Sequence, residues 1–165
     1  MLTQERLKQL LRYDPETGLF YWLEDRGGRK AGDVAGCTKR NYTGISVDDK
    51  IYRAHLLAWF YMTGRWPDSF LDHKDLNKHN NAWGNLREAT KSQNMANVGV
   101  IKSNKSGLKG VSRYRAGESY GKPWQAGIQK DGKRKHLGHF ATKEEAHAAY
   151  CVAAEKMFGE YARAA

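Results

Sequence analysis

The sequence predicts an α+β fold in two parts, each combining short antiparallel strands with helices. Three observations support this: strand-like alternation broken by turn residues, helical periodicity at residues 55–63 and 142–158, and linker composition at residues 98–106. A length of 165 residues suits one large domain or two small ones. With 40% hydrophobic and 12% aromatic residues, the chain can bury a compact core.

The first part is expected to begin with a helix over residues 3–12, capped by Thr3, a turn at residues 14–18 and a strand at residues 19–22. A basic, Gly-rich loop at residues 26–30 precedes a hairpin of residues 42–47 and 51–53. An apolar helix over residues 55–63 ends at Gly64. Strands at residues 70–73 and 83–89 then lead to a helix over residues 91–97, capped by Thr90.

The second part has three expected strands and one long helix. The strands cover residues 110–115, 124–129 and 134–140, and Asp131-Gly132 is a strong hairpin turn between the last two. Thr142 and Glu145 form a capping box that opens a helix to about residue 158. Such a sheet can bury one face on the helix and offer the other face to a partner.

The charge of the chain indicates which class of partner it binds. The formal net charge is +10, and residues 105–165 carry 12 Lys and Arg against 6 Asp and Glu. This favours a polyanion, with nucleic acid first and an anionic membrane surface second. No apolar run approaches the roughly 20 residues of a membrane span, and no signal peptide is expected. Cys37 and Cys151 are single and far apart, so we expect no structural zinc, no disulfide framework and a reducing compartment.

The polar stretch from Leu71 to Asn94 carries the candidate chemistry. It contains the adjacent pair Asp72-His73, then Asn85 twelve residues after the His, and Asn94 nine residues further. Carboxylate, amide and imidazole groups suit a hard metal ion and an activated water. A hairpin followed by a helix can bring Asp72 and Asn94 together. Each of these residues also has a purely structural alternative. Asp72 and His73 could end a strand and hydrogen-bond a turn, Asn85 could be a turn residue, and Asn94 could lie on an ordinary helix surface.

Two segments of the chain resemble known families. Residues 53–97 resemble the HNH endonucleases of phages and mobile introns, through Arg53-Ala54-His55, Thr63-Gly64-Arg65-Trp66-Pro67, Leu71-Asp72-His73, Asn80-Asn81, Asn85-Leu86-Arg87-Glu88-Ala89-Thr90 and Gln93-Asn94-Met95-Ala96-Asn97. Residues 107–162 are similar to AP2/ERF-type DNA-binding domains, through Gly107-Leu108-Lys109-Gly110-Val111, Trp124-Gln125-Ala126-Gly127-Ile128, Leu137-Gly138-His139-Phe140, Glu144-Glu145-Ala146 and Ala149-Tyr150. The resemblance implies a leader at 1–52, a ββα-metal nuclease core at 53–97, a linker at 98–106 and an AP2/ERF-like domain at 107–165.

The HNH resemblance also implies roles for the polar residues. Asp72 and Asn94 would hold one divalent metal ion, with Mg²⁺ as the first candidate and Mn²⁺ as the second. His73 would be the general base that activates water, and Asn85 would orient His73 through a hydrogen bond from its side-chain oxygen. His55 is expected to be structural, and Asp75 to be a turn acceptor. The implied products carry 5′-phosphate and 3′-hydroxyl ends.

The candidates for DNA contact lie in the expected strands of the second part. Arg can bind guanine bidentately, Gln can bind adenine, and Lys can bind phosphate. The candidates are Arg113, Arg115, Trp124, Gln125, Gln129, Lys133 and Lys135. Strand alternation allows only some of them to face DNA, and Trp124 is alternatively a support beneath the sheet.

Three functions are therefore compared. The first is a metal-dependent DNA endonuclease of phage or homing type, acting on double-stranded DNA as a monomer or weak dimer in the cytoplasm, without a membrane partner. The second is a non-catalytic DNA-binding protein, such as a transcription factor with a degenerate nuclease domain. All four expected positions (Asp72, His73, Asn85 and Asn94) carry competent residues, which favours the enzyme. The third is RNA binding or cleavage.

Overall fold

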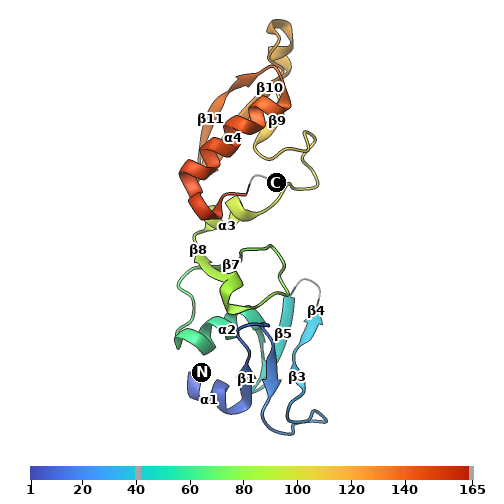
Figure 1. Ribbon diagram of the computed structural model, residues 1–165, viewed down its shortest axis with the longest axis vertical. Coiled ribbons are helices and arrows are strands. Elements are labelled where there is room, and N and C mark those ends of the chain that lie inside the picture. Colours follow the sequence, from blue (N-terminus) through green and yellow to red (C-terminus); the bar gives the residue numbers. More distant parts are fainter. Residues whose placement is uncertain (40–41, 164–165) are drawn as a thin grey trace. The chain divides into compact units, whose positions relative to one another are not determined.

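The computed structural model describes residues 1–39 and 42–163, so residues 164 and 165 of the expected 107–165 domain lie outside the described residues. The chain divides into two compact units, Met1–Glu88 and Ala89–Ala165. Each unit mixes helices with small antiparallel strands (Figure 1). Among the described residues, no helix combines the length and apolarity needed to cross a membrane.

Residues 1–39 and 42–88 of the first unit contain three small sheets. They are β1-β2-β3, β4-β5-β6 and β7-β8. The elements follow in the order α1 (Gln4–Leu10), β1 (Leu11–Tyr13), β2 (Phe20–Trp22), β3 (Val34–Ala35), β4 (Cys37–Lys39), β5 (Tyr42–Val47), β6 (Lys50–Arg53), α2 (Ala54–Thr63), β7 (Phe70–His73), a 3-10 turn η1 (Trp83–Asn85) and β8 (Leu86–Ala89).

The core of the first unit is built by apolar side chains from α1, α2 and the first strands. Leu7, Phe20, Ile45 and Leu57 are almost completely buried. The expected N-cap Thr3 is confirmed, because its hydroxyl accepts a hydrogen bond from the Arg6 amide at 3.1 Å. The helix expected over residues 3–12 ends earlier, at Leu10. The next residues form β1 because their side chains alternate between buried and exposed and pair with β2.

The hairpin before α2 and the helix end agree with the sequence prediction. β5 and β6 pair in an antiparallel register, and Asp48 and Asp49 in the turn take positive φ values of 46° and 61°. α2 ends at Gly64, whose φ of 74° is left-handed. The strand expected over residues 83–89 is wrong in its first half. Residues Trp83–Asn85 form a 3-10 turn, and the strand begins only at Leu86.

The second unit consists of a three-stranded sheet and helices. The elements are α3 (Lys91–Asn97), β9 (Val111–Arg113), a 3-10 helix η2 (Arg115–Tyr120), β10 (Trp124–Lys130), β11 (Lys133–Phe140), α4 (Lys143–Phe158) and a 3-10 turn η3 (Gly159–Tyr161). The sheet order is β11-β10-β9. The strand expected over residues 110–115 is shorter than predicted, because its last residue already belongs to η2.

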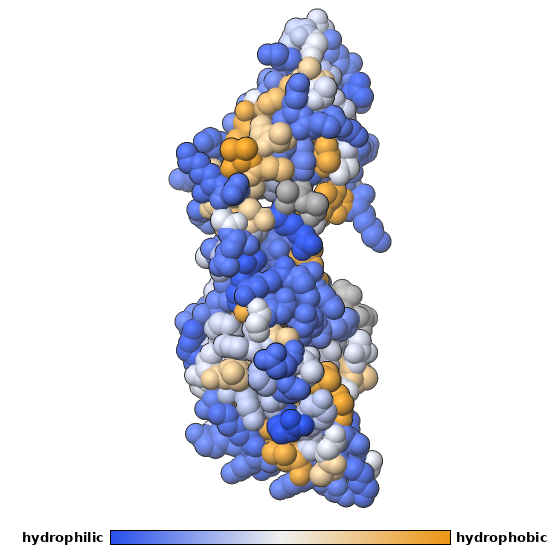
Figure 2. Space-filling model, in the orientation of Figure 1, coloured by the Kyte–Doolittle hydropathy of each residue, from blue (hydrophilic) through white to orange (hydrophobic). Residues whose placement is uncertain are grey.

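α4 covers one face of this sheet. Ala126 and Ile128 of β10 are buried against helix residues that include Ala146 and Tyr150. The predicted capping box is confirmed, with the Thr142 hydroxyl accepting from the Glu145 amide at 3.1 Å. Hydrophilic side chains occupy most of the visible surface of each unit, as Figure 2 shows. The fold is therefore a mixed α+β arrangement with several small antiparallel sheets, and a C-terminal helix packs on one of them.

Candidate nuclease site and nucleic-acid interface

Asp72 and His73 are the last two residues of β7, and both are buried, with 4% and 5% of their surface exposed. A buried carboxylate needs a partner. Arg87 of β8 donates to Asp72 Oδ2 from Nε at 3.0 Å and from Nη2 at 2.9 Å. Sequence reasoning missed this role of Arg87. The guanidinium holds the carboxylate in one orientation on the hairpin.

The His73 ring is oriented by Asn81 from the loop between β7 and β8. His73 Nε2 lies 3.1 Å from Asn81 Oδ1. The Asn81 amide nitrogen donates to the His79 carbonyl at 3.3 Å, which assigns the oxygen to the ring side. Nε2 therefore carries the hydrogen, and in the neutral imidazole the lone pair lies on Nδ1. Asn81 itself is only 3% exposed, so this arrangement is protected from water.

The position of Asn85 corrects the expected hydrogen bond to His73. Asn85 Oδ1 accepts from the Asp75 amide at 3.1 Å, and Nδ2 donates to Asp75 Oδ1 at 3.0 Å and to the Asn80 carbonyl at 2.7 Å. The reason is that Asn85 ends a 3-10 turn instead of lying in the strand, so its side chain points into the loop. Asn85 thus ties the loop together, and its role in catalysis stays a prediction.

Asp75 is the acceptor around which this loop closes. Its carboxylate accepts from the Asn77 amide at 2.8 Å and from the Asn80 side chain at 2.7 Å, besides the bond from Asn85. Partial burial opposes the charged carboxylate, but the hydrogen bonds from Asn80 and Asn85 outweigh it and lower the pKa of Asp75. The charged side chain therefore organises the turn, as the sequence predicted.

The N-terminal leader fixes the part of the loop that carries Asn81. The Tyr13 hydroxyl donates to the Asn81 carbonyl at 2.7 Å, and the Trp83 amide donates to the Pro15 carbonyl at 2.8 Å. Burial, and then the charge of Asp14, raises the pKa of Tyr13, so the hydroxyl remains a donor. Gly18 has a φ of 74°, and a Cβ there would lie 2.2 Å from the Ala82 nitrogen. Only glycine allows this close approach.

His55 lies beside His73 inside the same unit. The two ring centroids are 5.2 Å apart in an edge-to-face arrangement, and Tyr42 lies 5.2 Å from His55 on another side. Burial, followed by the nearby charges of His73 and Arg53, lowers the pKa of His55 to about 3. His55 is therefore a neutral, buried ring at physiological pH, which fits the structural role expected for it.

Asn94 belongs to the second unit, in α3, while Asp72, His73 and Asn85 belong to the first. The pairing of Asp72 with Asn94 on one metal therefore stays a prediction. Within residues 1–39 and 42–163, no group of three or more His, Cys, Asp and Glu side chains is arranged to hold a metal ion. The predicted pair, one carboxylate and one amide, supplies the oxygen donors that suit Mg²⁺, which keeps several of its waters.

The sheet of the second unit separates the predicted DNA-contact residues into two faces. Ala126 and Ile128 face α4, so Gln125 and Gln129, at alternate positions of β10, face away from it. Trp124 shares the α4 face and packs against the core there. Residues directly opposite each other share a face, which places Arg113, the partner of Trp124, on that side too.

Lys133, Lys135 and Arg115 complete the predicted set. Lys135 pairs with Ile128 and Lys133 pairs with Lys130, whose ammonium reaches the Met157 carbonyl of α4 at 3.2 Å. Both Lys residues therefore start from the α4 side of the sheet and are exposed. Arg115 is exposed in η2, outside the strands. The open face thus holds only Gln125 and Gln129 of the predicted set.

Sequence reasoning missed the residues of β11 that lie on the open face. Arg134 pairs with Gln129, His136 with Gly127 and His139 with Gln125. The His139 ring stacks on Tyr114 with centroids 4.2 Å apart, and His136 lies 4.7 Å from His139. The sequence could have indicated this face, because these residues alternate along the strand with Lys133, Lys135 and the apolar residues. Arg and aromatic rings on one face suit contact with nucleic acid.

Comparison with known proteins places these features in a family. A family model described as HNH endonuclease matches residues 52–96. The chain is 36% identical over 124 residues to an uncharacterized HNH endonuclease of Acanthamoeba polyphaga mimivirus, a match that covers 73% of this chain and 62% of that protein. It is 35% identical over 89 residues to Protein 3.8 of Escherichia phage T7, covering 53% of this chain and 70% of that protein. No solved structure matches the chain.

The family match contains the whole candidate site. It begins before α2, includes the hairpin with Asp72, His73, Asn81 and Arg87, and reaches α3 with Asn94. The chain spans 62% of the length of the mimivirus relative. On these matches, the chain belongs to the HNH endonuclease family.

Proposed function

We propose that the protein is a metal-dependent endonuclease that hydrolyses phosphodiester bonds of double-stranded DNA and leaves 5′-phosphate and 3′-hydroxyl ends. The observation that carries the proposal is the buried Asp72-His73 pair, with each side chain held by its own partner, Arg87 and Asn81. These supports favour the proposal because a general base and a metal ligand both need a defined orientation.

His73 is proposed as the general base. Because Asn81 accepts the hydrogen of Nε2, the lone pair of Nδ1 is the one that takes a proton from the attacking water. Asp72 and Asn94 are the proposed protein ligands of one divalent ion. When bound, Mg²⁺ would supply charge stabilisation for the phosphate and the departing 3′ oxygen, and Mn²⁺ would substitute. Asn85 acts on this site through the loop that it closes with Asp75.

The second unit is proposed as an AP2/ERF-like DNA-binding module. Support comes from its three-stranded antiparallel sheet backed by α4, and from the basic composition of residues 105–165. Gln125, Gln129 and Arg134 would face the bases, since Gln suits adenine and Arg suits guanine. The other cations predicted to contact DNA would bind phosphates from the rim of the sheet; they are Arg113, Arg115, Lys133 and Lys135. Trp124 supports the sheet from the α4 side.

Plasmid nicking tests the proposed activity. Supercoiled DNA is incubated with the protein in Mg²⁺ and in EDTA, and the wild type is compared with His73→Ala and His79→Ala. The second variant is a control, because the His79 side chain is exposed on the same loop. We expect His73→Ala to lose at least about 100-fold in rate and to keep its DNA affinity in a gel-shift assay. Mapping the ends of the products identifies the 5′-phosphate.

A protein that binds DNA but never cleaves it, with any divalent metal, would instead support the alternative of a non-catalytic DNA-binding protein. Competition between duplex DNA and structured RNA separates the RNA alternative. Phage DNA processing or homing, in the cytoplasm of a bacterial or phage-infected cell, is the proposed context. With one site per chain, a monomer is expected to nick one strand, and a double-strand break would need a dimer or two visits.

A further inference from the structure

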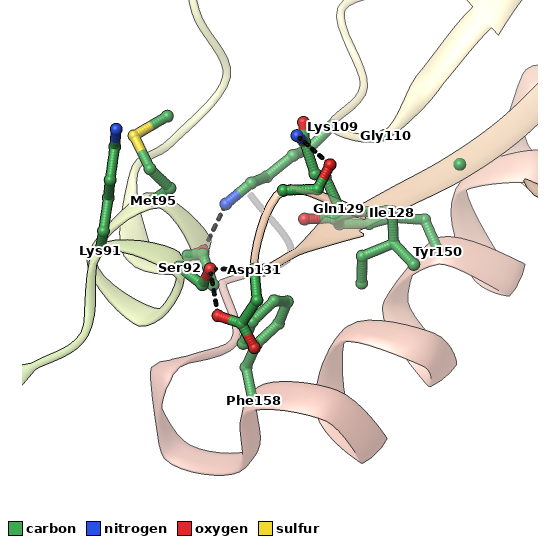
Figure 3. A pocket seen from close by; sticks show the side chains of 13 residues that line it. Lys91, Ser92, Met95, Lys109, Gly110, Ile128, Gln129, Asp131, Tyr150 and Phe158 are labelled. Carbon is green, nitrogen blue, oxygen red and sulfur yellow. Dashed lines mark hydrogen bonds between the residues drawn. The ribbon is translucent and has the colours of Figure 1, made fainter. Parts of the chain in front are cut away.

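The helix that carries Asn94 is attached to the hairpin tip of the C-terminal sheet. Ser92 Oγ donates to Asp131 Oδ1 at 2.9 Å and accepts from the Asp131 amide at 2.8 Å (Figure 3). Asp131 and Gly132 form the turn between β10 and β11, with φ values of 50° and 78°. A single serine of α3 therefore bonds both the side chain and the backbone of a rigid two-residue turn.

The other end of α3 is attached to the same unit. Ala96 is buried in one cluster with Ile128 and Tyr150. Its carbonyl accepts a hydrogen bond from the Arg163 amide at 3.3 Å and another from the Lys109 ammonium. The Lys109 ammonium also reaches the carbonyl of Val98, just after the helix. A cation at the last carbonyls complements the negative end of a helix dipole.

Between these attachments the packing of α3 is incomplete. A cavity of about 610 Å³ lies beside the helix, and its lining includes Met95, Ile128, Tyr150 and Phe158 (Figure 3). Polar contacts at both ends of α3 therefore add to the apolar packing of Ala96 in holding the helix within the second unit.

The length of α3 makes these contacts necessary. The helix has seven residues, whereas isolated helices below about 12 residues are marginal in water. The Thr90–Gln93 capping box stabilises its first turn, but a cap alone does not fix where a helix lies. Its position must come from tertiary contacts, and the second unit provides those described above.

We infer that Ser92, Asp131 and Lys109 are positioning residues: within the second unit they hold α3, and with it the proposed metal ligand Asn94. This inference rests on the proposed function of Asn94. It implies that the AP2/ERF-like unit is not a detachable targeting module, since removing its contacts with α3 would weaken metal binding as well as DNA binding.

The test uses the full chain and four variants. Ser92→Ala removes both bonds to Asp131, and Lys109→Met removes the ammonium but keeps the aliphatic stem. Ser92→Thr keeps a hydroxyl and serves as the rescue, and Ser103→Ala is the matched control on an exposed serine of the same unit. Hydrogen exchange is followed at the amides of Asn94 and Val98, which bond to carbonyls within the α3 region, and at the amides of α4.

We expect Ser92→Ala and Lys109→Met each to speed exchange in α3 about tenfold, while exchange in α4 stays at the wild-type rate. The Mg²⁺ concentration for half-maximal nicking should rise by a similar factor, and the rate at saturating Mg²⁺ should stay near that of the wild type. Binding of Mn²⁺ without DNA should weaken in parallel. Ser92→Thr and Ser103→Ala should behave like the wild type.

Two results would overturn the inference. Unchanged α3 exchange in both Ser92→Ala and Lys109→Met would show that these residues do not hold the helix. Faster α3 exchange with an unchanged metal requirement would show that the position of α3 does not matter to the metal. A wild type that neither nicks DNA nor binds Mn²⁺ would instead refute the endonuclease proposal, and the exchange data would still decide the docking of α3.

Discussion

Replacing Asn81 is the sharpest test of how the candidate base is oriented. Asn81→Leu keeps the size of the side chain and removes both of its hydrogen bonds, to His73 Nε2 and to the His79 carbonyl. The contact from the Tyr13 hydroxyl survives, because it is made to the backbone carbonyl. The substitution therefore acts on the His73 ring and leaves the leader attached to the loop.

The magnitude follows from burial. Asn81 and His73 are 3% and 5% exposed, so the abandoned Nε2 hydrogen has little access to water. Leaving one buried donor unpaired costs about 1–3 kcal/mol, so we expect a loss of about 2 kcal/mol in the free energy of unfolding. Residues that orient a catalytic group through a hydrogen bond typically contribute 10- to 100-fold, and we expect a loss of that size in the nicking rate.

The assay compares Asn81→Leu with Asn85→Ala. Urea denaturation gives the free energy of unfolding, single-turnover nicking gives the rate, and the ¹⁵N shifts of the His73 ring report its tautomer. Asn85→Ala breaks the loop bonds to Asp75 and Asn80, so it should lower stability and leave the Nε2–H tautomer in place. A wild-type rate and tautomer in Asn81→Leu, with an altered ring in Asn85→Ala, would refute the assignment and restore the sequence-based one.

Three further perturbations follow from the first unit. Arg87→Met leaves the buried Asp72 carboxylate without its guanidinium partner and should lower the free energy of unfolding by about 3 kcal/mol, measured in urea. Gly18→Ala should lower it by at least about 2 kcal/mol, from left-handed strain and a clash with the loop backbone, whereas Gly28→Ala, at a φ of 82° with open space around it, adds only the strain. The pKa of His55 is lowered to about 3 in the folded chain. The free energy of unfolding should therefore fall as the pH drops below about 6.5, by about 2 kcal/mol between pH 7 and 5.

The sign of the pH effect comes from proton uptake. Between about pH 6.5 and 3 the unfolded chain binds a proton at His55 and the folded chain does not, so acid favours unfolding. His55→Gln should flatten this dependence, and an equally steep curve in the variant would rule out His55 as its source. Equal losses in Gly18→Ala and Gly28→Ala would contradict the close approach at Gly18. Full stability of Arg87→Met would contradict a buried ion pair.

Much of the local structure could be predicted because its causes lie within a few residues. Thr3, Thr90 and Thr142 begin helices since each hydroxyl accepts from a backbone amide three residues later. Asp131-Gly132 makes its hairpin because both residues tolerate a positive φ. The candidate site could be predicted from the Asp72-His73 pair for a similar reason, because its two candidate groups are adjacent in the sequence.

The predictions that were wrong or stayed open depend on contacts between residues far apart in the chain. Asn81 rather than Asn85 meets His73, because Trp83–Asn85 form a 3-10 turn, and the leader contacts that turn through the Pro15 carbonyl. Arg87 lies next to Asp72 because β7 and β8 pair, and residues fifteen positions apart in the sequence then face each other.

The sequence by itself therefore determined the caps, the turns, the charge and the family motif, since these arise from short-range sterics and hydrogen bonds. The tertiary structure alone decided which face of the C-terminal sheet is open, which asparagine holds His73, and that α3 with Asn94 packs in the second unit. The physical reason is that burial selects among locally equivalent side chains, and burial is a property of the whole folded unit.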